Sequence, residues 1–210
     1  MGQERTDEEL LAAYQQGDTG AFELLLRRHR APLFTFLVRM LGDRQRAEDL
    51  AQETFLRIVK GAQAWEHRAR FQTWLFTIAR NLCVDQGRRD RFRRTDSLDE
   101  TGPDDEPAMV DCVPGREIDP ARGAESARLR PVLQRALLSL PAEQREVFIL
   151  REQAGVPFKE IAELVGVNEN TVKSRMRYAL EGLRKALAAA GVDADTAADE
   201  PAQGVRLGRA

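Results

Sequence analysis

Several residues and patterns that define whole classes of protein are scarce or missing in this sequence. Its 210 residues include 2 cysteines and 2 histidines. Cys83 and Cys112 cannot form a disulfide framework, and His29 and His67 lie far apart without other ligand types at metal-binding spacing. No apolar run approaches the ~20 residues of a membrane-spanning helix, and the N-terminal MGQERTDEEL lacks the apolar segment of a secretory signal. We therefore expect a cytoplasmic protein with no membrane insertion and no bound metal.

Catalytic signatures are missing as well. The sequence contains no HExxH, CxxC, GxxxxGK or nucleophile-elbow pattern. We therefore expect a protein that is not an enzyme and needs no cofactor. A small enzyme with an accessory DNA-binding domain is an alternative, which any measured turnover would revive.

Charge is unevenly distributed, although the net charge is only −2. Residues 68–94 hold 8 arginines against 2 aspartates, and residues 126–190 hold 11 lysines or arginines against 7 glutamates. Between them, residues 96–125 hold 10 acidic residues against 2 arginines. Two basic segments separated by an acidic one favour a polyanionic partner.

Helical periodicity dominates the chain, and we find no convincing strand alternation. Thr6 and Glu9 form a capping box that starts the first helix, Gly17 ends it, and Asp43 is the predicted N-cap of the third helix. We predict an all-α fold of two small helical domains joined by a flexible acidic linker. The expected helices begin at the capping box and then cover about residues 21–41, 43–60, 71–94, 125–139, 142–153, 158–165 and 169–189.

Two details of this prediction concern the interior. Pro32, inside the second helix, predicts a kink or a break near Arg28. Apolar residues recur at helical spacing in the fourth helix, and Cys83 beside them is a predicted core residue. The predicted buried stripe of this helix consists of Phe71, Trp74, Leu75, Ile78 and Leu82.

Composition divides the chain into domains. Residues 95–124 are rich in Asp, Glu, Gly and Pro and have no period, which is typical of a linker that is disordered by itself. The first domain is therefore predicted to span 6–94 and the second 125–189. Residues 190–210, rich in Ala, Gly and Asp, are predicted to form a disordered tail.

Residues 158–185, FKEIAELVGVNENTVKSRMRYALEGLRK, have the spacing of a helix-turn-helix. Gly166 permits the turn, and Asn168 caps the second helix. Cationic and amide side chains gather on the outer face of its N-terminal half, the end that enters the major groove in such motifs. An ordinary helical hairpin with a solvated basic face is the alternative interpretation.

Three features of the first domain complete a pattern. They are DRQRAEDLAQETFLRIVK at 43–60, a loop carrying Trp65, and FQTWLFTIARN, which continues into GRRDRFRR and ends at residue 94. Together with the helix-turn-helix and the acidic linker, these features resemble the bacterial RNA polymerase sigma factors. The most similar branch is the compact extracytoplasmic-function (ECF) type, which keeps only regions 2 and 4. The resemblance covers about residues 6–189 and implies a protein that binds core RNA polymerase, directs promoter recognition, melts the minus-ten element and initiates transcription.

The resemblance implies that the AEDLAQETF segment docks on a coiled coil of the polymerase β′ subunit. The β flap of the polymerase and an anti-sigma factor are further implied partners. The docking residues lie off the predicted buried stripe of their helix, although a solvated charged face would look the same. They are Asp49, Gln52, Glu53, Leu56 and Arg57.

The resemblance also implies that the loop and the fourth helix read the minus-ten element on the non-template strand. Reading bases pulled from the stack requires an aromatic wall, groups for base edges, and cations for phosphates. The implied contacts are Trp65, Arg80, Asn81, Asp85, Arg88 and Arg89.

The second domain is implied to bind the duplex minus-thirty-five element. The implied contacts are Glu169, Asn170, Thr171, Lys173, Ser174, Arg175 and Arg177. The sequence departs from the family pattern at Tyr178-Ala179-Leu180, where a second basic cluster is common, which predicts a lower or differently tuned affinity for this element.

A transcriptional regulator that binds duplex DNA without polymerase is the runner-up interpretation. It explains residues 158–185, with the first domain used for oligomerisation. It does not explain the AEDLAQETF segment, Trp65 or Asn81. Binding to core polymerase in the absence of DNA distinguishes the two.

Overall fold

Local capping signals set the helix boundaries in the computed structural model, which describes residues 5–66, 69–96 and 120–192. α1 (Asp7–Gln15) begins at the predicted capping box, in which Thr6 Oγ1 accepts a hydrogen bond from Glu9 N at 3.2 Å and Glu9 Oε2 accepts one from Thr6 N at 2.7 Å. Asp43 caps α3 (Arg44–Gly61), and Asn168 caps α8 (Glu169–Ala189). These predicted N-caps are confirmed, because each side chain satisfies an amide that the first helical turn leaves without a partner.

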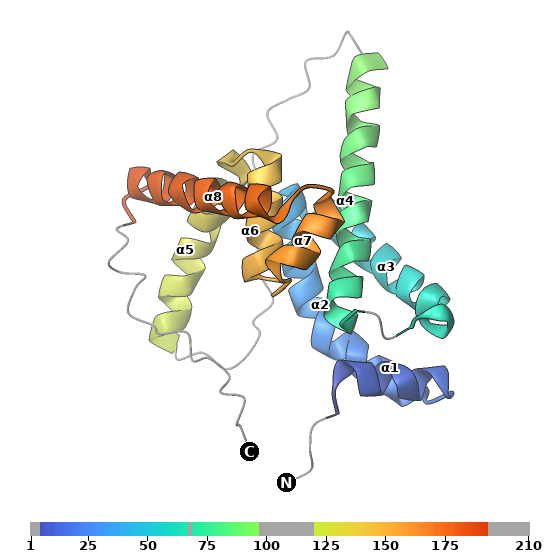
Figure 1. The fold of residues 1–210 in the computed structure, drawn as a ribbon. Coiled ribbons are helices and arrows are strands. Elements are labelled where there is room, and N and C mark those ends of the chain that lie inside the picture. Colours follow the sequence, from blue (N-terminus) through green and yellow to red (C-terminus); the bar gives the residue numbers. More distant parts are fainter. Residues whose placement is uncertain (1–4, 67–68, 97–119, 193–210) are drawn as a thin grey trace, which may run out of the picture.

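The helices form two groups (Figure 1). α1, α2 (Thr19–Leu41), α3, the short η1 (Ala62–Ala64) and α4 (Phe71–Asp96) make the first domain. α5 (Pro120–Ser139), α6 (Ala142–Glu152), α7 (Phe158–Val165) and α8 make the second. Every regular element within the described ranges is a helix, which confirms the all-α prediction.

The ends of the predicted linker are helical. α4 continues through residue 96, and α5 begins at Pro120, a residue type favoured at the first position of a helix. The rest of the predicted linker, with Cys112, and nearly all of the predicted tail lie outside the described residues.

α2 passes through Pro32 without interruption, so the break predicted as one outcome near Arg28 does not occur. A proline inside a helix costs about 3 kcal/mol, since it removes one backbone hydrogen bond and crowds the preceding turn. Leu25, Leu33 and Phe36 are all at most 1% exposed on either side of it. Burial of such side chains contributes roughly 1.5–3 kcal/mol each, and packing therefore outweighs the defect.

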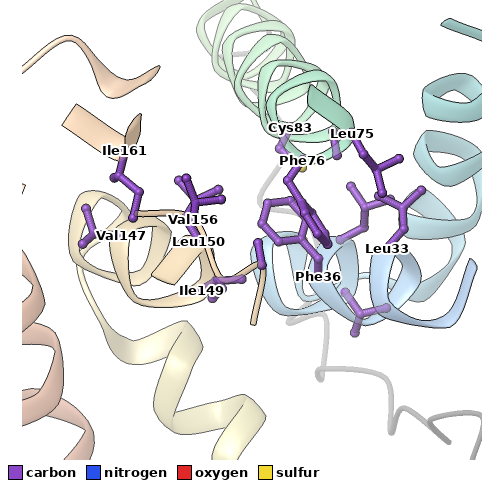
Figure 2. Packing of buried hydrophobic residues seen from close by; sticks show 14 of the residues in the cluster. Leu33, Phe36, Leu75, Phe76, Cys83, Val147, Ile149, Leu150, Val156 and Ile161 are labelled. Atoms are coloured by element: carbon purple, nitrogen blue, oxygen red, sulfur yellow. The ribbon is translucent and has the colours of Figure 1, made fainter. Parts of the chain in front are cut away.

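The buried stripe of α4 differs from the predicted one. Trp74 and Ile78 are only half-buried, whereas Phe76, Ala79 and Cys83 are buried. The stripe is therefore rotated around the helix relative to the prediction, although Cys83 is confirmed as a core residue. The reason is that this side of α4 packs on α2, where the ring centroids of Phe36 and Phe76 lie 4.9 Å apart, and Figure 2 shows these two side chains together.

The two domains pack against each other and share one continuous apolar core. In Figure 2, Phe36 and Phe76 from α2 and α4 lie beside Ile149 and Leu150 from α6. Polar bonds fix the edges of this contact: Gln134 Nε2 donates to the backbone oxygen of Val38 at 2.9 Å. The sequence predicted two separate domains joined by a flexible linker and gave no sign of this contact.

An ion-pair cluster secures α1 to α2. Asp7 Oδ1 accepts a hydrogen bond from Arg28 Nη1 at 2.9 Å, and Asp7 Oδ2 lies 2.6 Å from Nε2 of the buried His29. Burial opposes ionisation of Asp7, but the bonds from His29 and Arg28 outweigh it and lower the pKa of this carboxyl group. The cluster fixes the position of α1, which in turn supports the Trp65 loop.

Candidate nucleic-acid and protein interfaces

The outer face of α3 presents apolar side chains surrounded by charged ones. Leu56 is 53% exposed, and Val59, one turn further along, is 39% exposed. Arg57 Nε donates to Glu53 Oε1 at 2.8 Å, and this bond lowers the pKa of Glu53. Asp49, Gln52 and Arg57 are exposed and Glu53 is half-buried, so the predicted docking residues share one accessible surface. An apolar centre with a polar rim suits a protein partner.

Two tryptophans line an open cavity between the end of α3 and the start of α4. The ring centroids of Trp65 and Trp74 are 6.1 Å apart, with the planes inclined by 32°. The cavity measures about 470 Å³ and is lined by Gly61, Ala64, Trp65, Glu66 and Trp74. Trp74 was predicted to be a core residue, but it packs on the core with one side and lines this cavity with the other.

The loop that carries Trp65 is fixed by α1. Gln15 Nε2 donates to the backbone oxygens of Ala62 at 2.7 Å and of Trp65 at 3.1 Å. Gly61 allows the loop to approach Trp74, because a Cβ atom at this position would lie 3.0 Å from the indole ring. The cavity walls are therefore held in place from both sides.

One face of α4 collects the predicted base-reading residues. Trp74, Asn81, Asp85 and Arg88 follow one another at spacings of seven, four and three residues, and such spacings place side chains on the same side of a helix. Asn81, Asp85, Arg88 and also Arg89 are exposed. The polar face of α4 thus continues from the tryptophan cavity toward the basic end of the helix.

Arg80 points in another direction from the residues with which it was grouped. It lies about 100° around the helix from Asn81 and is half-buried. Its Nε donates to Glu146 Oε1 of α6 at 2.5 Å, and its Nη1 donates to Asn81 Oδ1 at 3.3 Å. In this structure Arg80 is a link between the two domains.

The N-terminal half of α8 exposes four of its seven predicted contacts. Asn170, Lys173, Ser174 and Arg177 are exposed, whereas Glu169, Thr171 and Arg175 are half-buried. Lys173 Nζ lies 2.6 Å from Glu169 Oε1 one turn earlier. Such an exposed pair contributes little to stability and breaks readily for another anion.

Arg175 is held against its own domain. Its Nη2 donates to Glu143 Oε2 in the first turn of α6 at 2.5 Å, and its side chain is only 19% exposed. Arg177 lies over the Tyr178 ring, with 4.9 Å between Cζ and the ring centroid, and remains exposed. Tyr178 and Leu180, the two departures from the family pattern, are 48% and 45% exposed.

Both domains match family models. Residues 25–93 match sigma-70 region 2, and residues 130–183 match sigma-70 region 4. The ECF RNA polymerase sigma factor SigM of Mycobacterium tuberculosis is 32% identical over 185 residues, covering 88% of this chain and 86% of SigM. The chain belongs to the ECF family of RNA polymerase sigma factors. The predicted family is confirmed.

Other proteins similar to this ECF sigma factor support the same family assignment. SigE of Mycolicibacterium smegmatis is 33% identical over 177 residues, which are 84% of this chain and 65% of that protein. The sigma factor RpoE of Bartonella quintana, solved in complex with the anti-sigma factor NepR, superposes with a TM-score of 0.59 and 25% identity, covering 80% of this chain and 96% of RpoE. The protein therefore directs transcription initiation, and its region 2 and region 4 domains bind core RNA polymerase and promoter DNA.

The structure adds residues to the candidate surfaces of this sigma factor. Val59 extends the apolar centre around Leu56, and its spacing of three residues could have indicated this. Glu66 and Trp74 join Trp65 at the cavity. In the described part of the chain, the helices lack the long apolar stretch that crossing a bilayer requires, and no three potential metal ligands converge.

Proposed function

We propose that this sigma factor divides its work among three surfaces. The outer face of α3 docks on the β′ coiled coil of core polymerase, the tryptophan cavity and the polar face of α4 hold the minus-ten element, and the N-terminal half of α8 binds the minus-thirty-five duplex. The observation that carries this proposal is that the three surfaces are accessible and lie on different helices. One chain can therefore hold the enzyme and both promoter elements.

At the minus-ten element, a base that leaves the stack enters the open cavity that Trp65 and Trp74 line. Stacking on an aromatic ring stabilises an unpaired base by about 1–3 kcal/mol. Asn81 and Asp85 face the neighbouring base edges, and Arg88 and Arg89 follow the phosphates.

At the minus-thirty-five element, the exposed Asn170, Lys173, Ser174 and Arg177 make the first contacts. Lys173 exchanges Glu169 for a phosphate. Arg175 reaches the duplex only when it leaves Glu143. Tyr178 offers an aromatic edge where relatives commonly have a cation, which reduces the electrostatic part of the affinity.

An anti-sigma protein is the inhibitor that these surfaces suit. The related RpoE was solved in complex with one. A protein that covers Leu56 and Val59, or the face of α4, blocks polymerase or promoter without any chemical change to the sigma factor.

Open-complex formation by the Asn81→Ala variant tests the minus-ten assignment. We expect Asn81→Ala to reduce promoter melting and to relax the base preference at the minus-ten element, while core polymerase binding stays unchanged. Permanganate footprinting on promoters with single-base changes measures both effects. Gln86→Ala is the matched control, because this amide on the same helix bonds to Asp90 instead of facing the promoter. Unaltered melting and base preference in Asn81→Ala would refute the role.

A further inference from the structure

The first helix, α1, precedes the part of the chain that matches sigma-70 region 2, which begins at residue 25. It nevertheless lies across the end of the first domain at which α3 finishes and α4 starts (Figure 1). Two of its side chains bond to the backbone on either side of the loop that carries Trp65. α1 is therefore in a position to shape the tryptophan cavity.

Gln15 of α1 holds the start of this loop. Its Nε2 donates to the backbone oxygens of Ala62 at 2.7 Å and of Trp65 at 3.1 Å, and an amide nitrogen carries the two hydrogens that this requires. Trp65 N also donates to the oxygen of Ala62 at 3.2 Å, and Ala62 is 0% exposed. The backbone of Trp65 is thus tied at both its amide and its carbonyl, which sets the point from which the indole ring projects.

Glu8 of α1 holds the other end of the loop. Its Oε1 accepts a hydrogen bond at 3.0 Å from Phe71 N, the first amide of α4. Such an amide has no partner within its own helix, and the preceding Arg70 has no acceptor in its side chain. A carboxylate also interacts favourably with the positive end of the helix dipole. Glu8 therefore fixes the turn of α4 that carries Trp74, the second wall of the cavity.

The two holding side chains belong to one rigid and well-anchored element. Glu8 and Gln15 are seven residues apart, which places them on the same face of α1 with a rise of about 10 Å between them. Leu10 and Leu11 are buried, and Asp7 bonds to α2. α1 therefore sets the distance between the two ends of the loop, and with it the placement of both tryptophans.

We propose that α1 is part of the minus-ten binding site, and that Gln15 is a positioning residue that holds Trp65 ready for an unpaired base. This inference rests on the function proposed above, because it names the residues that shape the same cavity. Gln15 acts through Trp65 and not by contact with DNA. A wall that already stands in its binding position need not be ordered when the base arrives, so loss of Gln15 lowers the apparent affinity for the base.

The Gln15→Glu variant tests the proposal in the full-length chain. It keeps the shape of the side chain but replaces the donor by a carboxylate, which only accepts hydrogen bonds and would face two carbonyl oxygens. The chain has 2 tryptophans, and both line the cavity, so intrinsic fluorescence reports on the cavity alone. We expect stronger quenching of this fluorescence by acrylamide, because the Trp65 loop is released.

The same variant should bind DNA less tightly. We expect about tenfold weaker binding of a fork-junction DNA with a single-stranded minus-ten element, as for a cavity wall that is in place about one-tenth of the time. Binding of core polymerase should stay unchanged. Wild-type quenching or wild-type DNA affinity in folded Gln15→Glu would overturn the proposal.

Matched variants separate the lost donor from the added charge. Gln15→Lys keeps a donor for the two carbonyls and should show quenching and DNA affinity close to wild type. Gln16→Glu and Gln16→Lys place the same charges at the exposed neighbouring position and correct for net charge. Equal losses in Gln15→Glu and Gln16→Glu, or in Gln15→Glu and Gln15→Lys, would contradict the positioning role.

Two further variants separate positioning from stability. Circular dichroism establishes that each variant is folded, and Gln15→Ala, which removes the donor without adding a charge, decides the question if Gln15→Glu is not. Phe34→Ala loosens the packing of a half-buried residue on α2 and leaves both loop bonds in place. It should keep the wild-type quenching, and an increase equal to that of Gln15→Glu would overturn the proposal.

Trp65→Ala in the same DNA-binding experiment separates this proposal from the proposed function. If Trp65→Ala binds the fork-junction DNA as tightly as wild type, the cavity holds no base, and the proposed function fails at this surface. If Trp65→Ala weakens binding and Gln15→Glu does not, only the positioning role fails. The quenching measurement contains no DNA and therefore tests the placement of Trp65 by itself.

Discussion

Leu56→Asp is expected to weaken binding of core RNA polymerase by about tenfold or more, and to reduce run-off transcription at limiting sigma factor to the same degree. Leu56 is 53% exposed, and with Val59 it forms the apolar centre of the α3 face. The substitution removes apolar contact and leaves a desolvated carboxylate at the centre of the interface. Loss of such a central residue commonly costs about 2 kcal/mol or more of binding free energy, which is roughly a thirtyfold increase in the dissociation constant. Fluorescence anisotropy of the labelled sigma factor titrated with core polymerase measures the loss.

Leu129→Asp is the matched control for this experiment. Leu129 is 38% exposed on α5, so the same substitution adds the same charge at a leucine of the other domain. The exposed position of Leu56 also predicts an unchanged melting temperature for Leu56→Asp. Wild-type polymerase affinity in Leu56→Asp would remove the α3 face from the proposed mechanism.

Phe76→Ala is expected to lower the free energy of unfolding by about 3–5 kcal/mol, because truncation of a fully buried phenylalanine leaves a cavity. Phe76 is 0% exposed, and its ring centroid lies 4.9 Å from that of Phe36, which is buried as well. The residue packs against α2 in the buried core (Figure 2). Denaturant unfolding followed by circular dichroism measures the change.

Phe34→Ala removes the same side chain from a half-buried position and serves as the comparison. Phe34 packs on the edge of the core beneath Arg44, whose guanidinium carbon lies 5.3 Å from the ring centroid. We expect roughly 1–2 kcal/mol for this variant, since less apolar surface is lost. Equal losses in the two variants would contradict the assignment of Phe76 to the shared core.

The helix boundaries could be predicted because they depend on neighbouring residues. Thr6, Asp43 and Asn168 each accept a hydrogen bond from a backbone amide three residues along the chain. Such signals are complete within one turn of sequence. The possible break at Pro32 was wrongly predicted, because the packing that keeps α2 continuous comes from side chains on other helices and is not visible in the neighbouring sequence.

The contact between the domains could not be predicted, because its partners are distant in the sequence. Arg80 and Glu146 are 66 residues apart, and Thr73 and Glu160 are 87 apart. Nothing in local periodicity reports which of two exposed-looking helix faces meets another domain. Periodicity likewise does not show which side of α4 packs on α2, so the predicted stripe included Trp74 and omitted Phe76.

The candidate surfaces were predictable to the extent that a family pattern marks their positions. Asn81, Asp85 and Arg88 share the exposed face that the prediction required. Arg80 and Arg175 carry the expected charge, but their directions depend on Glu146 and Glu143, which no motif connects to them. A sequence pattern can name a residue type at a position, whereas the partner that holds it comes from the fold.

The most direct test of the central claim is association of the purified full-length chain with core RNA polymerase, followed by multi-round run-off transcription from a pool of promoter fragments. We predict that the two elute together without DNA and that a defined subset of promoters yields RNA only when the chain is present. Failure to elute together, or equal RNA with and without the chain, would contradict the account.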